Sequence, residues 1–106
     1  MASLSTHVLD TATGRPAVGL RVTLETVEGT VVKEAVTDAD GRVGELAAEL
    51  PTGGHRLRFD TGAWFARQDL AAFYPEVVVA FTVTDDAHFH VPLLLSPFGY
   101  STYRGN

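Results

Sequence analysis

The sequence predicts an all-β domain, a sandwich of short strands with one short helix. Its hydrophobic residues recur with a period of two, which is the spacing of side chains on one face of a strand. Turn-forming pairs such as Asp40-Gly41 and Gly53-Gly54 separate the apolar segments at short intervals. The chain has 106 residues, which is the length of one domain. We therefore expect a single domain over residues 1–106.

Four segments carry the alternation in chain order. Residues 20–25 alternate apolar and polar side chains, the pattern of a strand with one buried and one solvated face. Residues 31–36 form a less regular apolar strand. Residues 56–59 alternate arginine with a large apolar residue, and residues 77–83 are apolar on both faces. Turns are expected at residues 13–16, 28–29, 38–41, 51–54 and 85–86.

One segment departs from the period of two. Between Trp64 and Phe73, the apolar residues Phe65, Leu70 and Phe73 lie near helical spacing. Pro75 follows, and proline ends a helix because it lacks the backbone donor. We expect one short helix over residues 64–73.

The segment 88–95 has two unlike faces. Its odd-numbered members make a natural core face: Phe89, Val91, Leu93 and Leu95. Its even-numbered members include His90 and Pro92 and are too apolar for a solvated face, and a proline lacks the donor that a central strand needs. Near the N-terminus, His7 and Leu9 likewise project from one face. A partly apolar outer face is typical of a surface that a second subunit covers.

Composition excludes several classes of function. The net charge is −5 and no stretch clusters lysine or arginine, so no nucleic-acid surface is expected. The absence of cysteine excludes disulfides, zinc–thiolate sites and a cysteine nucleophile. The N-terminus does not resemble a signal peptide, and the longest apolar run falls far short of the about 20 residues of a membrane helix. We expect a cytoplasmic protein that binds neither nucleic acid nor membrane.

The histidines are the first candidates for chemistry. His55 follows two glycines at the start of a strand, which predicts a surface turn position. His88 and His90 project from one face because residues i and i+2 of a strand do so. Such a pair ligates a metal only when a third ligand joins it, so the pattern alone favours a pair without a metal. Arg42 by itself is typical of a solvated strand start.

The turn before Arg42 contains two aspartates. Asp38 and Asp40 resemble half of a calcium loop, but Arg42 occupies the fifth position, where such a loop needs a ligand. A hairpin turn is therefore expected instead. A serine hydrolase is poorly supported, because the chain has no Gly-x-Ser-x-Gly motif.

Three stretches of the chain form a specific signature. The chain opens with Leu4-Ser5-Thr6-His7-Val8-Leu9-Asp10, followed by Gly14-Arg15-Pro16-Ala17. Asp38-Ala39-Asp40-Gly41-Arg42 lies in the middle, and residues 88–105 contain His-Phe-His-Val-Pro-Leu-Leu-Leu-Ser-Pro and end in Tyr-Ser-Thr-Tyr-Arg-Gly. Together these stretches resemble the 5-hydroxyisourate hydrolases of the transthyretin-like family over nearly the whole chain. Transthyretin, a hormone carrier, shares the fold but lacks the catalytic histidines, the arginine and the Tyr-Arg-Gly ending, so the resemblance favours an enzyme.

The resemblance implies a β-sandwich of two four-stranded sheets and a homotetramer, a dimer of dimers, whose central channel holds the sites. The implied catalytic set is His7, Arg42 and His90. The implied substrate-binding residues of the tail are Tyr103, Arg104, Gly105 and Asn106. Tyr103 is expected to narrow the channel to the size of a purine. The family usually has serine where this chain has Asn106, so an amide stands in place of a hydroxyl.

The activity that the resemblance implies is the hydrolysis of 5-hydroxyisourate to 2-oxo-4-hydroxy-4-carboxy-5-ureidoimidazoline in urate catabolism. One of His7 and His90 would activate water, since the pKa of histidine lies near neutrality. The other would orient the substrate or protonate the leaving nitrogen. Arg42 would keep the imidazoles neutral and bind the substrate's oxygens. This scheme requires no metal and no organic cofactor.

Two other classes of function are compatible with parts of the sequence. A transthyretin-like carrier would bind a small aromatic ligand without turnover, but Tyr103 and the histidines argue against it. A structural β-sandwich for protein interaction has no need of histidine and arginine beside an apolar interface face. Binding without catalysis would support the carrier, and a stable monomer would support the structural module.

Overall fold

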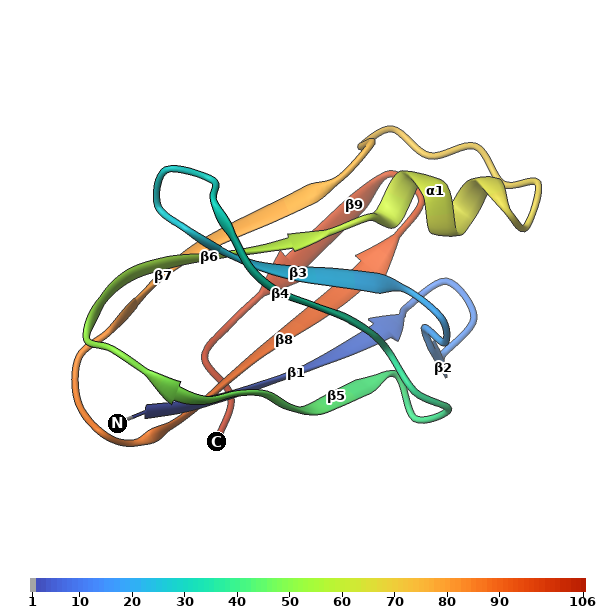
Figure 1. Ribbon diagram of the computed structural model, residues 1–106. Coiled ribbons are helices and arrows are strands. Elements are labelled where there is room, and N and C mark those ends of the chain that lie inside the picture. Colours follow the sequence, from blue (N-terminus) through green and yellow to red (C-terminus); the bar gives the residue numbers. More distant parts are fainter. Residues whose placement is uncertain (1) are drawn as a thin grey trace.

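Two sheets of strands face each other in the computed structural model, which describes residues 2–106 (Figure 1). In chain order the elements are β1 (Ala2–Asp10), β2 (Arg15–Pro16), β3 (Arg21–Thr26), β4 (Val31–Val36), β5 (Arg42–Leu50), β6 (Gly53–Phe59), α1 (Thr61–Ala66), β7 (Val77–Val83), β8 (His88–Ser96) and β9 (Gly99–Thr102).

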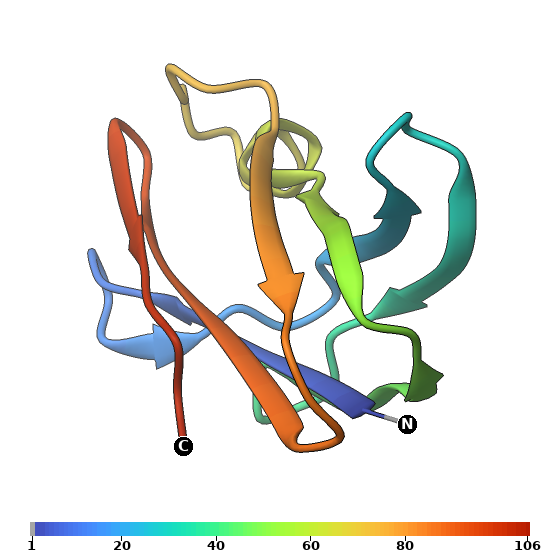
Figure 2. The ribbon, with the colours of Figure 1, turned by 90° about the vertical axis from the view of Figure 1, so that its left-hand side faces the viewer.

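One sheet has the order β2-β1-β8-β9, with β5 also paired to β1, and the other has the order β4-β3-β6-β7. Apart from the two-residue strand β2, each sheet has four strands. Figure 2 shows β9 and the chain end on one side of the molecule and β4 on the other. The expected all-β sandwich of two four-stranded sheets with one short helix is confirmed.

The parallel pair of β1 and β8 forms the centre of the first sheet. Its register runs from Ser3 opposite His88 to Asp10 opposite Leu95. The odd-numbered residues of β8 are all buried between the sheets, as their alternation predicts: Phe89, Val91, Leu93 and Leu95. The outer face of this pair carries His7, His88 and His90.

Pro92 lies within this central strand, and the pairing pattern explains why its missing donor is tolerated. The ladder between β8 and β9 ends with Leu93 opposite Thr102 and resumes with His90 opposite Gly105 in the same register. The break therefore falls opposite Pro92, whose carbonyl accepts a 2.7 Å hydrogen bond from the Thr102 hydroxyl.

The polar face of β3 differs from the prediction. Thr23 and Glu25 were expected in solvent, but they are 0% and 1% exposed. β3 is a central strand between β4 and β6, so long side chains of its neighbours cover it. Glu25 lies 2.8 Å from Arg58 and 3.6 Å from Arg56, both on β6. A central position in the sheet buries polar residues that sequence alternation assigns to the surface.

The prediction of a helix over residues 64–73 was wrong in its bounds. α1 begins at Thr61 and ends at Ala66. It is closed by a Schellman motif, in which Leu70 N–H bonds to Phe65 C=O at 3.1 Å and Asp69 N–H bonds to Ala66 C=O at 3.1 Å. Asp69 takes the left-handed conformation, with φ of 57°, in the place where glycine usually signals the helix end. No glycine or proline therefore marks the helix end in the sequence before Pro75.

Two further expectations are corrected by the structure. His55 is 8% exposed rather than at the surface, because it lies in β6 and its Nε2 is 2.8 Å from the Pro51 carbonyl. The turn at Asp38–Gly41 is present, but it is not a hairpin, since β4 and β5 belong to different sheets. No helix within residues 2–106 has the length and apolar character of a membrane span.

Candidate functional site

His7 and Arg42 lie directly opposite each other on the antiparallel strands β1 and β5. The aspartate-rich turn before β5 fixes the backbone of Arg42. Its first residue, Asp38, uses Oδ1 to accept the N–H groups of Asp40 at 2.9 Å and Arg42 at 3.0 Å. These bonds lower the pKa of the Asp38 carboxyl, because they favour its charged form. The pair of aspartates therefore builds the corner that presents Arg42 to β1.

Gly41 is the residue of this corner that no other amino acid replaces without strain. Its φ is +73°, and a Cβ atom there would lie 2.6 Å from the carbonyl oxygen of Val8 and 2.9 Å from Cβ of Pro16. The Gly41 carbonyl itself accepts the Val8 N–H at 2.8 Å. Close approach of this corner to β1 sets the position of Arg42 relative to His7.

His90 reaches the same outer face from β8. It lies opposite Ser5 in the parallel register, while His7 lies two residues further along β1, on the same side of the sheet. Nδ1 of His90 is 2.7 Å from the Ser5 hydroxyl oxygen. Three segments far apart in the sequence thus bring His7, Arg42 and His90 onto one face.

A surface pocket of about 270 Å³ opens on this face. Its lining residues are Ser5, Thr6, Arg42, Gly44, His88, His90 and Asn106. His7 is not among them, but His7 and Arg42 both disfavour a positive charge on His90. The pocket contains donors and acceptors from both central strands, from β5 and from the tail.

The surroundings keep both imidazoles neutral. Burial lowers the pKa of His90 below its ordinary value near 6.5, and the positive charge of Arg42 lowers it further, although a hydrogen bond with the backbone of Ser5 acts in the opposite direction. Burial and Arg42 also lower the pKa of His7, while the backbone of Asp40 raises it. A neutral imidazole at neutral pH is able to accept a proton from water.

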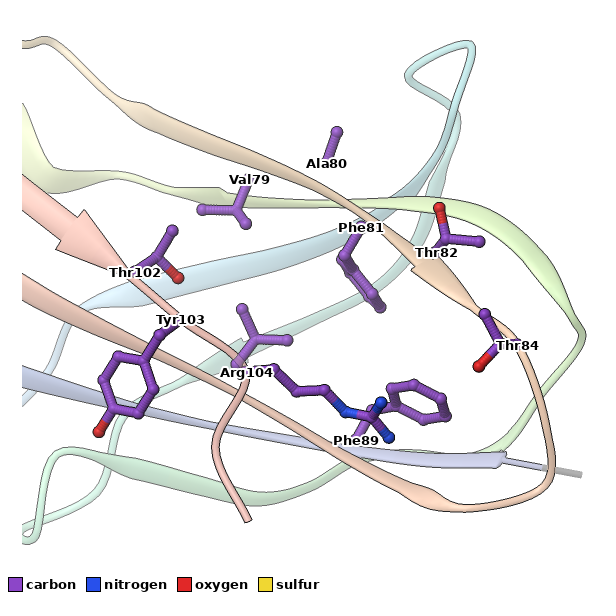
Figure 3. A pocket seen from close by; sticks show the side chains of 10 residues that line it. Val79, Ala80, Phe81, Thr82, Thr84, Phe89, Thr102, Tyr103 and Arg104 are labelled. Carbon is purple, nitrogen blue, oxygen red and sulfur yellow. The ribbon is translucent and has the colours of Figure 1, made fainter.

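The tail divides between the two faces of the sheet. Gly105 donates its N–H to the His90 carbonyl at 2.8 Å, and Asn106 lines the pocket. Arg104 instead points to the inner face, where its guanidinium lies 4.4 Å from the centre of the Phe89 ring (Figure 3). Tyr103 is 57% exposed and points away from that pair. The roles of Tyr103 and Arg104 in binding substrate remain predictions.

Sequence reasoning missed the two serines of β1. Ser5 lies 2.8 Å from Nε2 of His88 as well as 2.7 Å from Nδ1 of His90, and Ser3 lies 2.6 Å from Nδ1 of His88. A signal was present, because Ser3, Ser5 and His7 alternate on one face of a strand. What the sequence did not reveal was that β1 and β8 are parallel neighbours.

Metal binding was weighed for the pair of His88 and His90. Among residues 2–106, no three side chains of histidine, aspartate or glutamate are grouped in a way that would hold a metal ion. The scheme without a metal or cofactor remains a prediction.

Comparison with known proteins places the chain in a family. A curated 5-hydroxyisourate hydrolase of Caulobacter vibrioides is 45% identical over 115 aligned positions, which cover 100% of both chains. The solved structure of Klebsiella pneumoniae 5-hydroxyisourate hydrolase is 44% identical, with a TM-score of 0.92 over 98% of this chain and 99% of that one. Sea bream transthyretin, solved in complex with thyroxine, is 33% identical, with a TM-score of 0.88 over 96% of this chain and 93% of its own. The family model described as HIUase/Transthyretin matches residues 4–105, and the chain belongs to this family.

Proposed function

We propose that this chain is a hydrolase that converts 5-hydroxyisourate to 2-oxo-4-hydroxy-4-carboxy-5-ureidoimidazoline in urate catabolism. The observation that carries the proposal is the meeting of Arg42 with two histidines of lowered pKa, His7 and His90, on one face of the sheet. The hydrolase relatives in bacteria and in mouse, 42–45% identical over nearly the whole chain, support the same activity.

Hydrolysis requires a base for the attacking water, stabilisation of the oxyanion and a proton for the leaving nitrogen. A neutral histidine takes a proton as the water oxygen bonds to the ring carbonyl carbon. The carbon–nitrogen bond then breaks, its electron pair stays on nitrogen, and the nitrogen takes up a proton. Acid–base catalysis of this kind contributes roughly 10²–10⁴-fold to the rate. In this proposal either His7 or His90 acts as the base that begins these steps.

Arg42 has two roles in this proposal. Its fixed positive charge holds the pKa of both histidines down, so that they remain bases. Its planar guanidinium also binds the substrate's oxygens and the developing oxyanion, which is worth about 10²–10³-fold in comparable sites. In the tail, Asn106 lines the pocket, and Gly105 pairs with His90.

A homotetramer, a dimer of dimers, is part of the same proposal. In the single chain the site lies on an open face, and Arg42 is exposed. His7, Leu9 and Leu94 on that face are half-buried, and Phe98 is 70% exposed. A second copy packed on this face would convert the shallow pocket into a closed one and exclude bulk water. Sedimentation velocity tests the assembly, and a stable monomer that is fully active would contradict it.

The activity is tested by adding the purified chain to urate and urate oxidase and following the absorbance of 5-hydroxyisourate. We expect the decay to accelerate in proportion to enzyme concentration, with many turnovers per chain. The alternative function is that of a non-catalytic carrier, which the similarity to transthyretin suggests. Stoichiometric binding with an unchanged decay rate would support the carrier. The cytoplasmic location remains a prediction that cell fractionation tests.

A further inference from the structure

A series of hydrogen bonds leads through four side chains from the catalytic pocket to the end of the β1–β8 pair where Ser3 and His88 lie. His90 Nδ1 lies 2.7 Å from Ser5 Oγ, and Ser5 Oγ lies 2.8 Å from His88 Nε2. His88 Nδ1 in turn lies 2.6 Å from Ser3 Oγ. Ser5 is 7% exposed, whereas the contact of Ser3 with His88 lies at the surface. This series of hydrogen bonds therefore begins at the half-buried imidazole of His90 and ends at a serine in contact with solvent.

The parallel pairing of β1 and β8 produces this arrangement. Ser3 lies opposite His88, and Ser5 lies opposite His90. Because residues two apart share a face, both serines and both histidines stand on the same side of the sheet. The offset along the two strands puts the Ser5 hydroxyl between the two rings.

The number of protons available restricts this series of hydrogen bonds to two arrangements of donors and acceptors. A serine hydroxyl has one proton, so Ser5 donates to one ring and accepts from the other. In the first arrangement the protons sit on Nδ1 of His90 and Nδ1 of His88, and Nε2 of His90 is free to act as a base. In the second they sit on Nε2 of both rings, and Nδ1 of His90 accepts from Ser5. A shift of every proton by one bond converts one arrangement into the other.

We propose that Ser5 and His88 are positioning residues that set the tautomer of His90 and carry its proton to solvent. This rests on the proposed hydrolase function and identifies His90 as the base that activates water. His90 takes the water proton at Nε2, and its Nδ1 proton passes to Ser5. The Ser5 proton passes to Nε2 of His88, the Nδ1 proton of His88 passes to Ser3, and Ser3 releases its own proton to water.

The same relay prepares the second half of the reaction. After the shift, the His90 ring is neutral and carries its proton on Nε2, where it can be donated to the leaving nitrogen. When it is donated, the relay runs backwards and solvent returns one proton to Ser3. The net change is one water consumed, with hydroxyl on the carbonyl carbon and hydrogen on the nitrogen.

The groups around His90 favour transfer of a proton from its ring to Ser5 over formation of an imidazolium. Arg42 of β5, His7 of β1 and His88 of β8 face the ring, and Asn106 of the tail has an uncharged side chain. Burial and these neighbours lower the pKa of His90, so an imidazolium there is disfavoured. The proposed relay avoids an imidazolium, because Nδ1 of His90 loses a proton as Nε2 gains one.

The kinetic test compares Ser5→Ala, Ser5→Thr and His88→Gln in the assembled enzyme. Ser5→Ala removes the bridging hydroxyl and is expected to lower kcat by about 10–100-fold, part of the contribution of acid–base catalysis, with KM unchanged. Ser5→Thr retains a hydroxyl and is expected to restore most of kcat. His88 is exposed, so His88→Gln spares folding, and it too is expected to lower kcat alone. Thr30→Ala, an exposed residue between β3 and β4, is the matched control and is expected to retain full activity.

Solvent deuterium distinguishes a relay from a structural role. In the unmutated enzyme kcat is expected to depend on the deuterium fraction along a curve, because several protons move together. In Ser5→Ala and His88→Gln the dependence is expected to become linear. A linear dependence in the unmutated enzyme, or unchanged kcat in both variants, would overturn the proposal.

Nitrogen NMR of the imidazoles separates this proposal from the proposed function, since it needs no turnover. We expect His88→Gln and Ser5→Ala each to move the ¹⁵N shifts of both His90 ring nitrogens, and Thr30→Ala to leave them in place. Unchanged His90 shifts in both relay variants would contradict the link between the rings, whatever the activity. If the His90 ¹⁵N shifts change but neither the variants nor the unmutated protein hydrolyse 5-hydroxyisourate, the proposed function is wrong. The link between the two imidazole rings is then still supported.

Discussion

Gly105 lies against the imidazole of His90 so closely that a Cβ atom on it would be 2.6 Å from the ring carbon Cδ2. The same glycine donates its N–H to the His90 carbonyl at 2.8 Å. The tail is thus bonded to the backbone of His90 and packed on the His90 side chain at a single position. Gly105 fixes the ring of His90 from the side opposite Ser5's hydrogen bond to it.

Replacing Gly105 with alanine is expected to push the His90 ring out of place and to lower kcat/KM by roughly 10²-fold, since displacements of about 1 Å have such effects. Steady-state kinetics of 5-hydroxyisourate decay measures this. Gly99→Ala is the matched control, because a Cβ there would lie at an ordinary 3.6 Å from the nearest atom, Ser96 Oγ. Equal activity of the two variants would show that the ring is not held by the tail.

Gly41→Ala is expected to destabilise the fold and to impair catalysis together. The left-handed φ of +73° costs about 1–3 kcal/mol for alanine, and the contact with Val8 adds to it. Gly14→Ala has a similar φ of +75° but open space around it, so urea unfolding should show a smaller loss. Equal losses in the two variants would mean that the corner before Arg42 is free to move away from β1.

Activity is expected to persist to a lower pH than an unperturbed histidine would allow, because the pKa values of His7 and His90 are lowered. Removing the positive charge with Arg42→Gln should raise both pKa values and move the acidic limb of kcat/KM to higher pH. A pH–rate profile tests this, with Lys33→Gln on β4 as the control for loss of a surface charge. An acidic limb that Arg42→Gln leaves in place would disprove the electrostatic role.

The lowered pKa values of His7 and His90 also determine whether stability rises or falls with pH. The unfolded chain binds protons at these histidines near pH 6.5, whereas the folded chain binds them only at lower pH. The contribution of these groups to stability is therefore lost as the pH falls from about 6.5 toward the folded pKa values. Urea midpoints of His7→Gln and His90→Gln variants should depend less on pH in this window. An identical pH dependence would contradict the lowered pKa values.

A substitution at Glu25 is expected to lower stability without lowering activity. Its buried carboxylate pairs with Arg58 at 2.8 Å on the sheet that does not carry His7 and His90. Glu25→Gln is expected to cost about 1–3 kcal/mol of unfolding free energy while leaving kcat of the folded enzyme unchanged. The exposed pair of Arg21 with Glu34, at 3.6 Å, provides the control, since Glu34→Gln should cost at most about 1 kcal/mol. A lower kcat in Glu25→Gln would show coupling between the sheets.

The sequence predicted most reliably what depends on a period of two. The core face of β8 and the projection of His90 and Pro92 from the other face followed from alternation alone. Burial of Thr23 and Glu25 did not, because alternation says nothing about which strand is central in its sheet. The helix end was missed because Asp69, rather than glycine, takes the left-handed conformation there.

The candidate site was predicted in part. Family resemblance supplied His7, Arg42 and His90, and the structure brings strands β1, β5 and β8 together on one sheet. The relation of Ser5 to both His88 and His90 required knowledge of the parallel register, which no local pattern encodes. The direction of Arg104 likewise follows from the register of β8 with the tail, which puts Arg104 opposite Val91, a residue buried between the sheets.

The most direct measurement is the rate of 5-hydroxyisourate decay with the unmutated chain, with His7→Ala, Arg42→Ala and His90→Ala, and with the triple variant. Residues that act as one site lose activity non-additively, so the triple variant is expected to be about as slow as the slowest single variant. Single variants that hydrolyse 5-hydroxyisourate as fast as the unmutated chain would contradict a catalytic site built from these three residues.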